Sequence, residues 1–243
     1  MTVATSIYRH FGGRRRVVVL VHGSLDAGEE WNDLTASFHG ADAEFIAVDL
    51  AGMGHRAGDS GPYTLERFVA DVGAITATTK KPVVMVGHSM GAQVAELCAA
   101  AQSANTVGLV LVAPVPLGGT GMSAADLAPF QTLAGHPDAQ RALRRQLGPH
   151  LTNAKLERLV EIGDLVRPDV ATELAQTWNR GHKDGAKPSA YGGPTLVARG
   201  GEDPFVTREL VSKSVLPRFK KASETIHHTS LRLSKAWKMG LQS

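Results

Sequence analysis

Five residues, Gly87-His88-Ser89-Met90-Gly91, lie between an apolar run and an alanine-rich run of the chain. The preceding residues, 82–86, are apolar and mostly β-branched, which favours a buried strand. The following residues, 90–101, favour a helix that packs closely on a sheet. A serine between two such elements must lie on a sharp turn, and the flanking glycines let neighbouring backbone come close. The pattern therefore predicts a strand, a turn that exposes the Ser89 hydroxyl, and a helix.

Similar strand and helix patterns alternate along much of the chain, which predicts a parallel sheet with helices on both faces. We expect strands at residues 16–21, 44–50, 82–86, 106–113 and 194–199, and helices at 31–38, 64–78 and 90–101. From 114 to 193 the alternation stops, and helical patterns occur at 123–133, 138–147, 153–162 and 168–180. We interpret this stretch as a helical cap inserted between two strands. The expected domains are 1–114 and 193–243 for the two parts of the α/β core, the second with an atypical C-terminus, and 115–192 for the cap.

A second motif, Val21-His22-Gly23-Ser24, ends the first expected strand. Acyl transfer requires two hydrogen-bond donors aimed at the oxyanion that forms on the substrate. The backbone N–H groups of Ser24 and Met90 are the candidates, since Gly23 lets the loop fold over the turn. For His22 we expect a structural role in bracing this loop.

Two further motifs contain the glycine and acid residues of sharp turns. Residues 49–54 have the pattern D-x-x-G-x-G, and residues 200–204 form an acid turn, Gly-Gly-Glu-Asp-Pro. With the His-Gly loop, the downstream Trp31 and the turn at Ser89, these motifs closely resemble those of the α/β-hydrolase superfamily between residues 16 and 210. The resemblance implies the α/β-hydrolase fold, a helical cap between the family's sixth and seventh strands, and a catalytic triad in the order serine, acid, histidine.

Ser89 is the expected nucleophile, and Asp203 is the expected acid because it follows a strand that ends at the same sheet edge. Glu202 is the neighbouring alternative. Only His227 and His228 follow Asp203, and we assign His228 as the base, with His227 as the alternative. Residues 223–226 are expected to begin the last strand of the sheet, directly before this pair. No glycine precedes the two histidines, and the tail beyond them is short. A truncated or altered C-terminus that leaves the triad incomplete is therefore a second interpretation.

Charge and composition restrict the partners. The net charge is +3, and the whole basic excess lies in residues 229–243, so nothing indicates a nucleic-acid surface. Cys98 is the only cysteine and is expected to be a small apolar filler of a helix. No apolar run has the length of a membrane span, and the N-terminal residues lack the pattern of a signal peptide. We expect a cytoplasmic monomer or homodimer that requires no cofactor and no metal and has no membrane partner.

The expected reaction is the hydrolysis of a small carboxylic ester through an acyl-enzyme. A serine nucleophile argues against haloalkane dehalogenases, which carry an aspartate there. Lactonases, carbon–carbon bond hydrolases, perhydrolases and hydroxynitrile lyases remain alternatives on this scaffold. The atypical histidine region favours one alternative of a different class, a non-catalytic or impaired ligand-binding protein. Phe130 and Trp178 could line a pocket in the cap, although packing is the favoured role for each.

Overall fold

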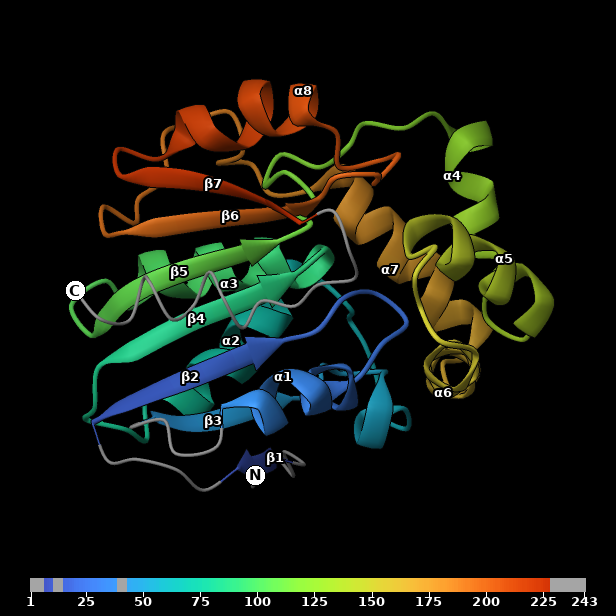
Figure 1. Ribbon diagram of the computed structural model, residues 1–243, viewed down its shortest axis with the longest axis horizontal. Helices are drawn as coiled ribbons and strands as arrows, with labels where there is room; N and C mark the ends of the chain where they lie inside the picture. Colours follow the sequence, from blue (N-terminus) through green and yellow to red (C-terminus); the bar gives the residue numbers. More distant parts are fainter. Residues whose placement is uncertain (1–6, 11–14, 39–42, 228–243) are drawn as a thin grey trace.

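The computed structural model describes residues 7–10, 15–38 and 43–227. This part of the chain forms a seven-stranded sheet in the order β1-β3-β2-β4-β5-β6-β7 (Figure 1). Strands β2 to β7 are parallel, and β1 pairs antiparallel with β3 at the edge. The strands are β1 (Ile7–His10), β2 (Arg16–Val21), β3 (Ala43–Val48), β4 (Val83–His88), β5 (Thr106–Val112), β6 (Thr195–Gly200) and β7 (Ala222–His227).

Helices connect the strands and also form one long insertion. The α-helices are α1 (Asn32–Ser37), α2 (Leu65–Thr76), α3 (Met90–Ala101), α4 (Ala124–Gln131), α5 (Pro137–Leu147), α6 (Asn153–Asp164), α7 (Pro168–Arg180) and α8 (Arg208–Leu210). Short helical turns are η1 (Gly28–Trp31), η2 (Gly54–Arg56), η3 (Val211–Val215) and η4 (Leu216–Arg218). Helices α4 to α7, the insertion helices, lie beyond the carboxyl ends of the parallel strands in Figure 1. Within the described ranges, no helix combines the length and apolarity that a bilayer span requires.

The core lies on both faces of the sheet because the parallel strands are apolar along both faces. Along β2, Val17 and Val19 pack with α2 and α3, whereas Val18 and Leu20 pack on the opposite face with Trp31. These four valine and leucine side chains are at most 1% exposed. The expected α/β fold with a mostly parallel sheet is confirmed.

Most expected elements lie within one or two residues of the observed ones, and α7 has the expected bounds. Strand β1 was not predicted. Its sequence, Ile-Tyr-Arg-His, lacks the continuous apolar run of a strand buried on both faces, and it pairs only with β3. The boundaries 115–192 for a cap domain stay a prediction, although α4 to α7 do lie between β5 and β6.

Helix α7 joins the insertion helices to the main core. Leu174 is fully buried in the same apolar cluster as the sheet. The backbone N–H of Tyr63 donates to Glu173 at 3.0 Å, and the Thr177 hydroxyl donates to the Tyr63 carbonyl at 2.9 Å. Gln93 of α3 donates to the carbonyl of Trp178 at 3.2 Å. Helix α7 therefore anchors the insertion to the sheet.

A buried ion pair fastens the segment that returns from the insertion. The Arg218 guanidinium in η4 donates to Glu96 of α3 at 2.7 Å, and both side chains are under 10% exposed. The same guanidinium donates to carbonyl groups of the segment after α7, those of Asp184, Gly185 and Lys187.

Arg218→Met should lower the free energy of unfolding by about 3–5 kcal/mol, because Glu96 would remain buried without its counter-charge. Urea denaturation measures this difference. Lys213→Met is the matched control, since it removes an exposed pair with Glu209 and should change stability little. Equal losses in the two variants would contradict a structural role for the buried pair.

Candidate functional site

Ser89 occupies the sharp turn between β4 and α3, and the expected strand–turn–helix is confirmed. Its φ of 53° and ψ of −118° lie outside the regions that L-residues normally adopt. Hydrogen bonds to β5 and the segment after it hold this conformation. The Ser89 N–H donates to the Val112 carbonyl at 2.9 Å, and the Val115 N–H donates to the Ser89 carbonyl at 3.2 Å. Strain of this kind is found where the surroundings fix a functional side chain.

The two glycines beside Ser89 are required by backbone contacts. A Cβ on Gly87 would lie 2.2 Å from the carbonyl oxygen of Gly91. A Cβ on Gly91 would lie 2.4 Å from the carbonyl oxygen of His22 and 2.5 Å from that of Val21. The start of α3 is therefore in direct backbone contact with the end of β2.

The loop after β2 lies against Ser89. A Cβ on Gly23 would be 3.3 Å from the Cβ of Ser89. His22 is fully buried and braces the loop as expected: its Nε2 accepts the Leu50 N–H at 3.0 Å, and its Nδ1–H donates to the Gly23 carbonyl at 2.7 Å. Asp49 adds support, since its carboxylate accepts the Gly28 N–H at 2.7 Å.

The two expected oxyanion donors belong to these adjoining elements. Ser24 is half-buried in the turn after Gly23, and Met90 is buried as the first residue of α3. The structure thus brings the backbone of both residues to the surroundings of Ser89.

The acid turn lies at the same edge of the sheet, directly after β6. One carboxylate oxygen of Asp203 accepts the N–H groups of Phe205 and Val206, each at 2.9 Å. Glu202 instead lies 3.5 Å from the imidazole of His150, and both of these side chains are more than half exposed.

The two candidate bases lie at the end of the described residues. His227 is the last residue of β7 and pairs in register with Gly200, three residues before Asp203. The backbone therefore reaches the acid turn at this point. His228 lies outside the described residues.

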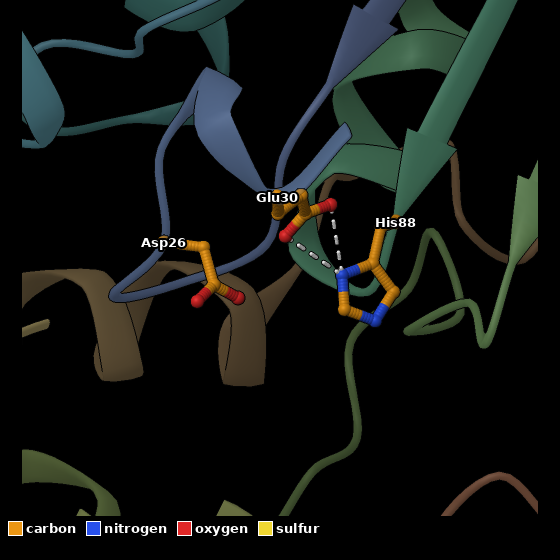
Figure 2. A group of neighbouring side chains, drawn as sticks. All are labelled: Asp26, Glu30 and His88. Carbon is orange, nitrogen blue, oxygen red and sulfur yellow. Dashed lines mark hydrogen bonds and ion pairs between the residues drawn. The ribbon is translucent and has the colours of Figure 1, made fainter. Parts of the chain in front are cut away.

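A charged cluster beside Ser89 was not anticipated from the sequence. Both carboxylate oxygens of Glu30 lie 3.2 Å from Nδ1 of His88, the residue before the serine (Figure 2). Asp26 lies on the loop next to them, and its carboxylate accepts the Arg144 guanidinium at 2.7 Å. The sequence signal available for this cluster was two acids four residues apart, directly after the His-Gly loop.

Burial and the charges of this cluster shift the pKa values of its three side chains. Burial would lower the pKa of His88, but the Glu30 and Asp26 carboxylates raise it to about 9. Asp203 adds a smaller effect in the same direction, so its charge acts on the turn at Ser89. Burial would raise the pKa of Asp26, but the charges of Arg144 and His88 outweigh burial and lower it. Burial raises the pKa of Glu30.

Asp26, Glu30 and His88 also offer one ligand atom each within 4.8 Å of one another, a spacing that could hold a metal ion. Asp26 is already bound by the guanidinium of Arg144, and His88 is hydrogen-bonded to Glu30. Two carboxylates thus face two cationic groups. The charges balance within the cluster, and we interpret it as an ion-pair network.

An open, mostly apolar hollow of about 590 Å³ lies between α4, α5 and the acid turn. Phe130 lines it and makes edge-to-face contacts with Phe205 and Trp178, at centroid distances of 5.7 and 5.3 Å. Trp178 is 7% exposed and packs in the core, whereas Phe130 faces the hollow. Cys98 is a buried filler, and burial raises the pKa of its thiol to about 12.

The His88 cluster predicts a pH dependence of stability. Because the pKa of His88 is raised from 6.5 to about 9 on folding, its stabilising effect is complete below pH 6.5 and declines as the pH rises through 9. The facing charged groups are Glu30, Asp26, Asp203 and, through Asp26, Arg144. We expect the stability difference between wild type and His88→Gln to shrink from pH 6 to pH 10 in urea denaturation. A difference that does not change with pH would contradict a charged His88.

The chain matches the model of the alpha/beta hydrolase family over residues 18–230. A lipase of Mycobacterium tuberculosis, Lipase LipV, is 35% identical over 98 residues, which are 40% of this chain and 36% of that protein.

Solved structures show the same fold at low sequence identity. An esterase from Exiguobacterium antarcticum (EaEST) superposes with a TM-score of 0.81 at 16% identity, covering 98% of this chain and 94% of that one. A bromoperoxidase from Bacillus anthracis superposes with a TM-score of 0.77 at 18% identity, covering 90% and 86%. The family match spans most of the chain, and the chain therefore belongs to the alpha/beta hydrolase family.

Proposed function

We propose that this hydrolase cleaves small carboxylic esters with Ser89 as nucleophile, Asp203 as acid and His228 as base. The observation that carries the proposal is the strained turn at Ser89, which hydrogen bonds to Val112 and Val115 hold and two flanking glycines make room for. Partial similarity to a lipase and fold similarity to an esterase are consistent with this reaction class.

In the proposed reaction, the Ser89 Oγ attacks the ester carbonyl carbon while its proton passes to the His228 imidazole. The tetrahedral intermediate collapses, and the alcohol leaves with that proton, so that the acyl group remains on Ser89. Water then attacks the acyl-enzyme with the same imidazole as base, which releases the carboxylic acid and restores Ser89. Asp203 orients the imidazole and stabilises its charged form.

The oxyanion of each intermediate would accept the backbone N–H groups of Ser24 and Met90. The contact of Gly23 with Ser89 and the start of α3 at Met90 support this assignment. The positive end of the α3 dipole adds to the stabilisation of negative charge.

Two observations favour Asp203 over Glu202 as the acid. Asp203 is held by two backbone N–H groups and acts electrostatically on His88, next to Ser89. Glu202 is exposed beside His150. The register of β7 supports a histidine at this edge, because His227 lies opposite Gly200.

The open apolar hollow between α4, α5 and the acid turn is the proposed place for the hydrocarbon part of the substrate, because Phe205 in its lining directly follows the acid turn. Met122, Phe130 and Phe205 supply apolar surface, and the insertion helices would thus act as the cap of the site. We further propose a cytoplasmic monomer or homodimer that acts on a small molecule and binds neither nucleic acid nor a membrane.

Ser89→Ala should lower the turnover of p-nitrophenyl acetate by at least about 10⁴-fold, because no other group replaces the nucleophile. Ser212→Ala, at an exposed serine, is the matched control and should retain wild-type turnover. Undiminished activity of a purified Ser89→Ala protein would rule out this mechanism. A folded wild type without turnover would favour a ligand-binding protein on the same fold.

The remaining triad assignments can be separated by paired variants. Asp203→Asn should lower kcat by about 10²–10⁴-fold, whereas Glu202→Gln should change it little. His228→Ala should abolish turnover, and His227→Ala should not. Steady-state kinetics with the same ester measures all four. A reversed order within either pair would transfer the role to the other residue.

A further inference from the structure

One side chain of the insertion helices reaches the loop beside Ser89. Arg144 of α5 donates from Nη1 to the Asp26 carboxylate at 2.7 Å and from Nη2 to the Leu25 carbonyl at 2.9 Å. The side chains of Arg144 and Asp26 are only 13% and 8% exposed. Such a two-point contact fixes geometry as well as charge, and its loss would leave the buried Asp26 carboxylate without its counter-charge.

The turn that Arg144 contacts is strained. Leu25 has a φ of 61°, in the left-handed region that bulky residues avoid. A conformation of this kind persists only where neighbouring groups enforce it. The two hydrogen bonds of Arg144 fall on this residue and the next one, which makes the guanidinium one of the groups that hold the turn.

The same turn packs against Ser89 through Gly23. A Cβ on Gly23 would meet the Cβ of Ser89 at 3.3 Å and the Asp26 carboxylate at 3.4 Å. The position of Asp26 is therefore linked through Gly23 to the surroundings of the serine.

The packing of α5 on α6 leaves room for this arginine. A Cβ on Gly163 of α6 would lie 3.1 Å from Nη2 of Arg144 and 2.1 Å from Oε1 of Gln140. Any larger residue at this position would displace the side chains that α5 directs towards α6 and the loop.

We propose that Arg144 is a positioning residue of the reaction, which holds the turn from Ser24 to Asp26 so that the Ser24 N–H is presented to the oxyanion. This inference rests on the proposed function, because it assigns the arginine a role in the oxyanion site. It also makes the oxyanion site dependent on the placement of the insertion helices, since the arginine belongs to α5.

A second cation of the insertion helices provides a matched comparison. Arg158 of α6 binds Glu29 in η1 at 2.7 Å, but its side chain is 56% exposed. Among the described residues its hydrogen bonds go to Glu29 and Glu161, not to Leu25 or Asp26. Arg158→Gln therefore breaks an ion pair between the insertion and the same connection without releasing the strained turn.

The test compares Arg144→Gln, Arg144→Lys and Arg158→Gln with wild type, all checked for folding by circular dichroism. For Arg144→Gln we expect kcat for p-nitrophenyl acetate to fall about 10- to 100-fold with KM within about twofold, since a misplaced oxyanion donor affects the transition state more than binding. Backbone amides of residues 24–27 should exchange hydrogen faster, as measured by mass spectrometry. Arg144→Lys keeps the charge but not the two-point contact, so its kcat and its amide exchange should lie between those of wild type and Arg144→Gln. Arg158→Gln should match wild type in both measurements.

Wild-type amide exchange at residues 24–27 in folded Arg144→Gln would overturn the proposal, as would an equal loss of kcat in Arg158→Gln. If Arg144→Gln does not fold, kcat and amide exchange at residues 24–27 are measured on Arg144→Lys instead, and wild-type exchange in that variant would overturn the proposal. The proposed function fails separately: wild type would then show no ester turnover, while the exchange data would still show whether Arg144 holds the turn.

Discussion

A close contact between two stretches of backbone organises the region around Ser89. Where α3 begins, Gly91 lies against the carbonyl groups of Val21 and His22, with no space for a Cβ between them. This contact brings the loop after β2 beside the turn at Ser89. The proposed oxyanion donors, the N–H groups of Ser24 and Met90, belong to the two stretches that this contact joins. Hydrogen bonds with Val112 of β5 and with Val115 after it hold the positive φ of Ser89. A donor pair held in advance of the reaction is what stabilises an oxyanion efficiently.

Next to this contact, a network of ion pairs connects the core to the insertion helices. Asp26 and Glu30 lie on the connection after β2, and His88 and Arg144 supply the opposite charges. Since Arg144 comes from α5, part of that balance is contributed by the insertion helices. Removal of either cation would leave a shielded carboxylate unpaired, which is costlier than the loss of a surface pair. The environment of Ser89 therefore depends on how the insertion packs.

The features that the sequence predicted are local ones. Continuous apolar runs marked the parallel strands, and the glycines around Ser89 marked the sharp turn, because both patterns act within a few residues. The edge strand β1 was not predicted, because it pairs with β3 alone and its sequence has no continuous apolar run. The ion pair between Asp26 and Arg144 could not be predicted, because 118 residues separate the two side chains. Nothing in the sequence around either residue indicates which opposite charge it will meet in the fold. The role of His228 stays a prediction, and that residue lies outside the described part of the chain.

The proposed function requires Ser89 to be an activated nucleophile. Reaction of the folded protein with a fluorophosphonate, followed by peptide mass spectrometry, tests it without knowledge of the natural substrate, because such probes modify only serines whose hydroxyl is activated by a base. We expect rapid formation of a single adduct, on Ser89. A folded protein that forms no adduct, or an adduct on another residue, would contradict it.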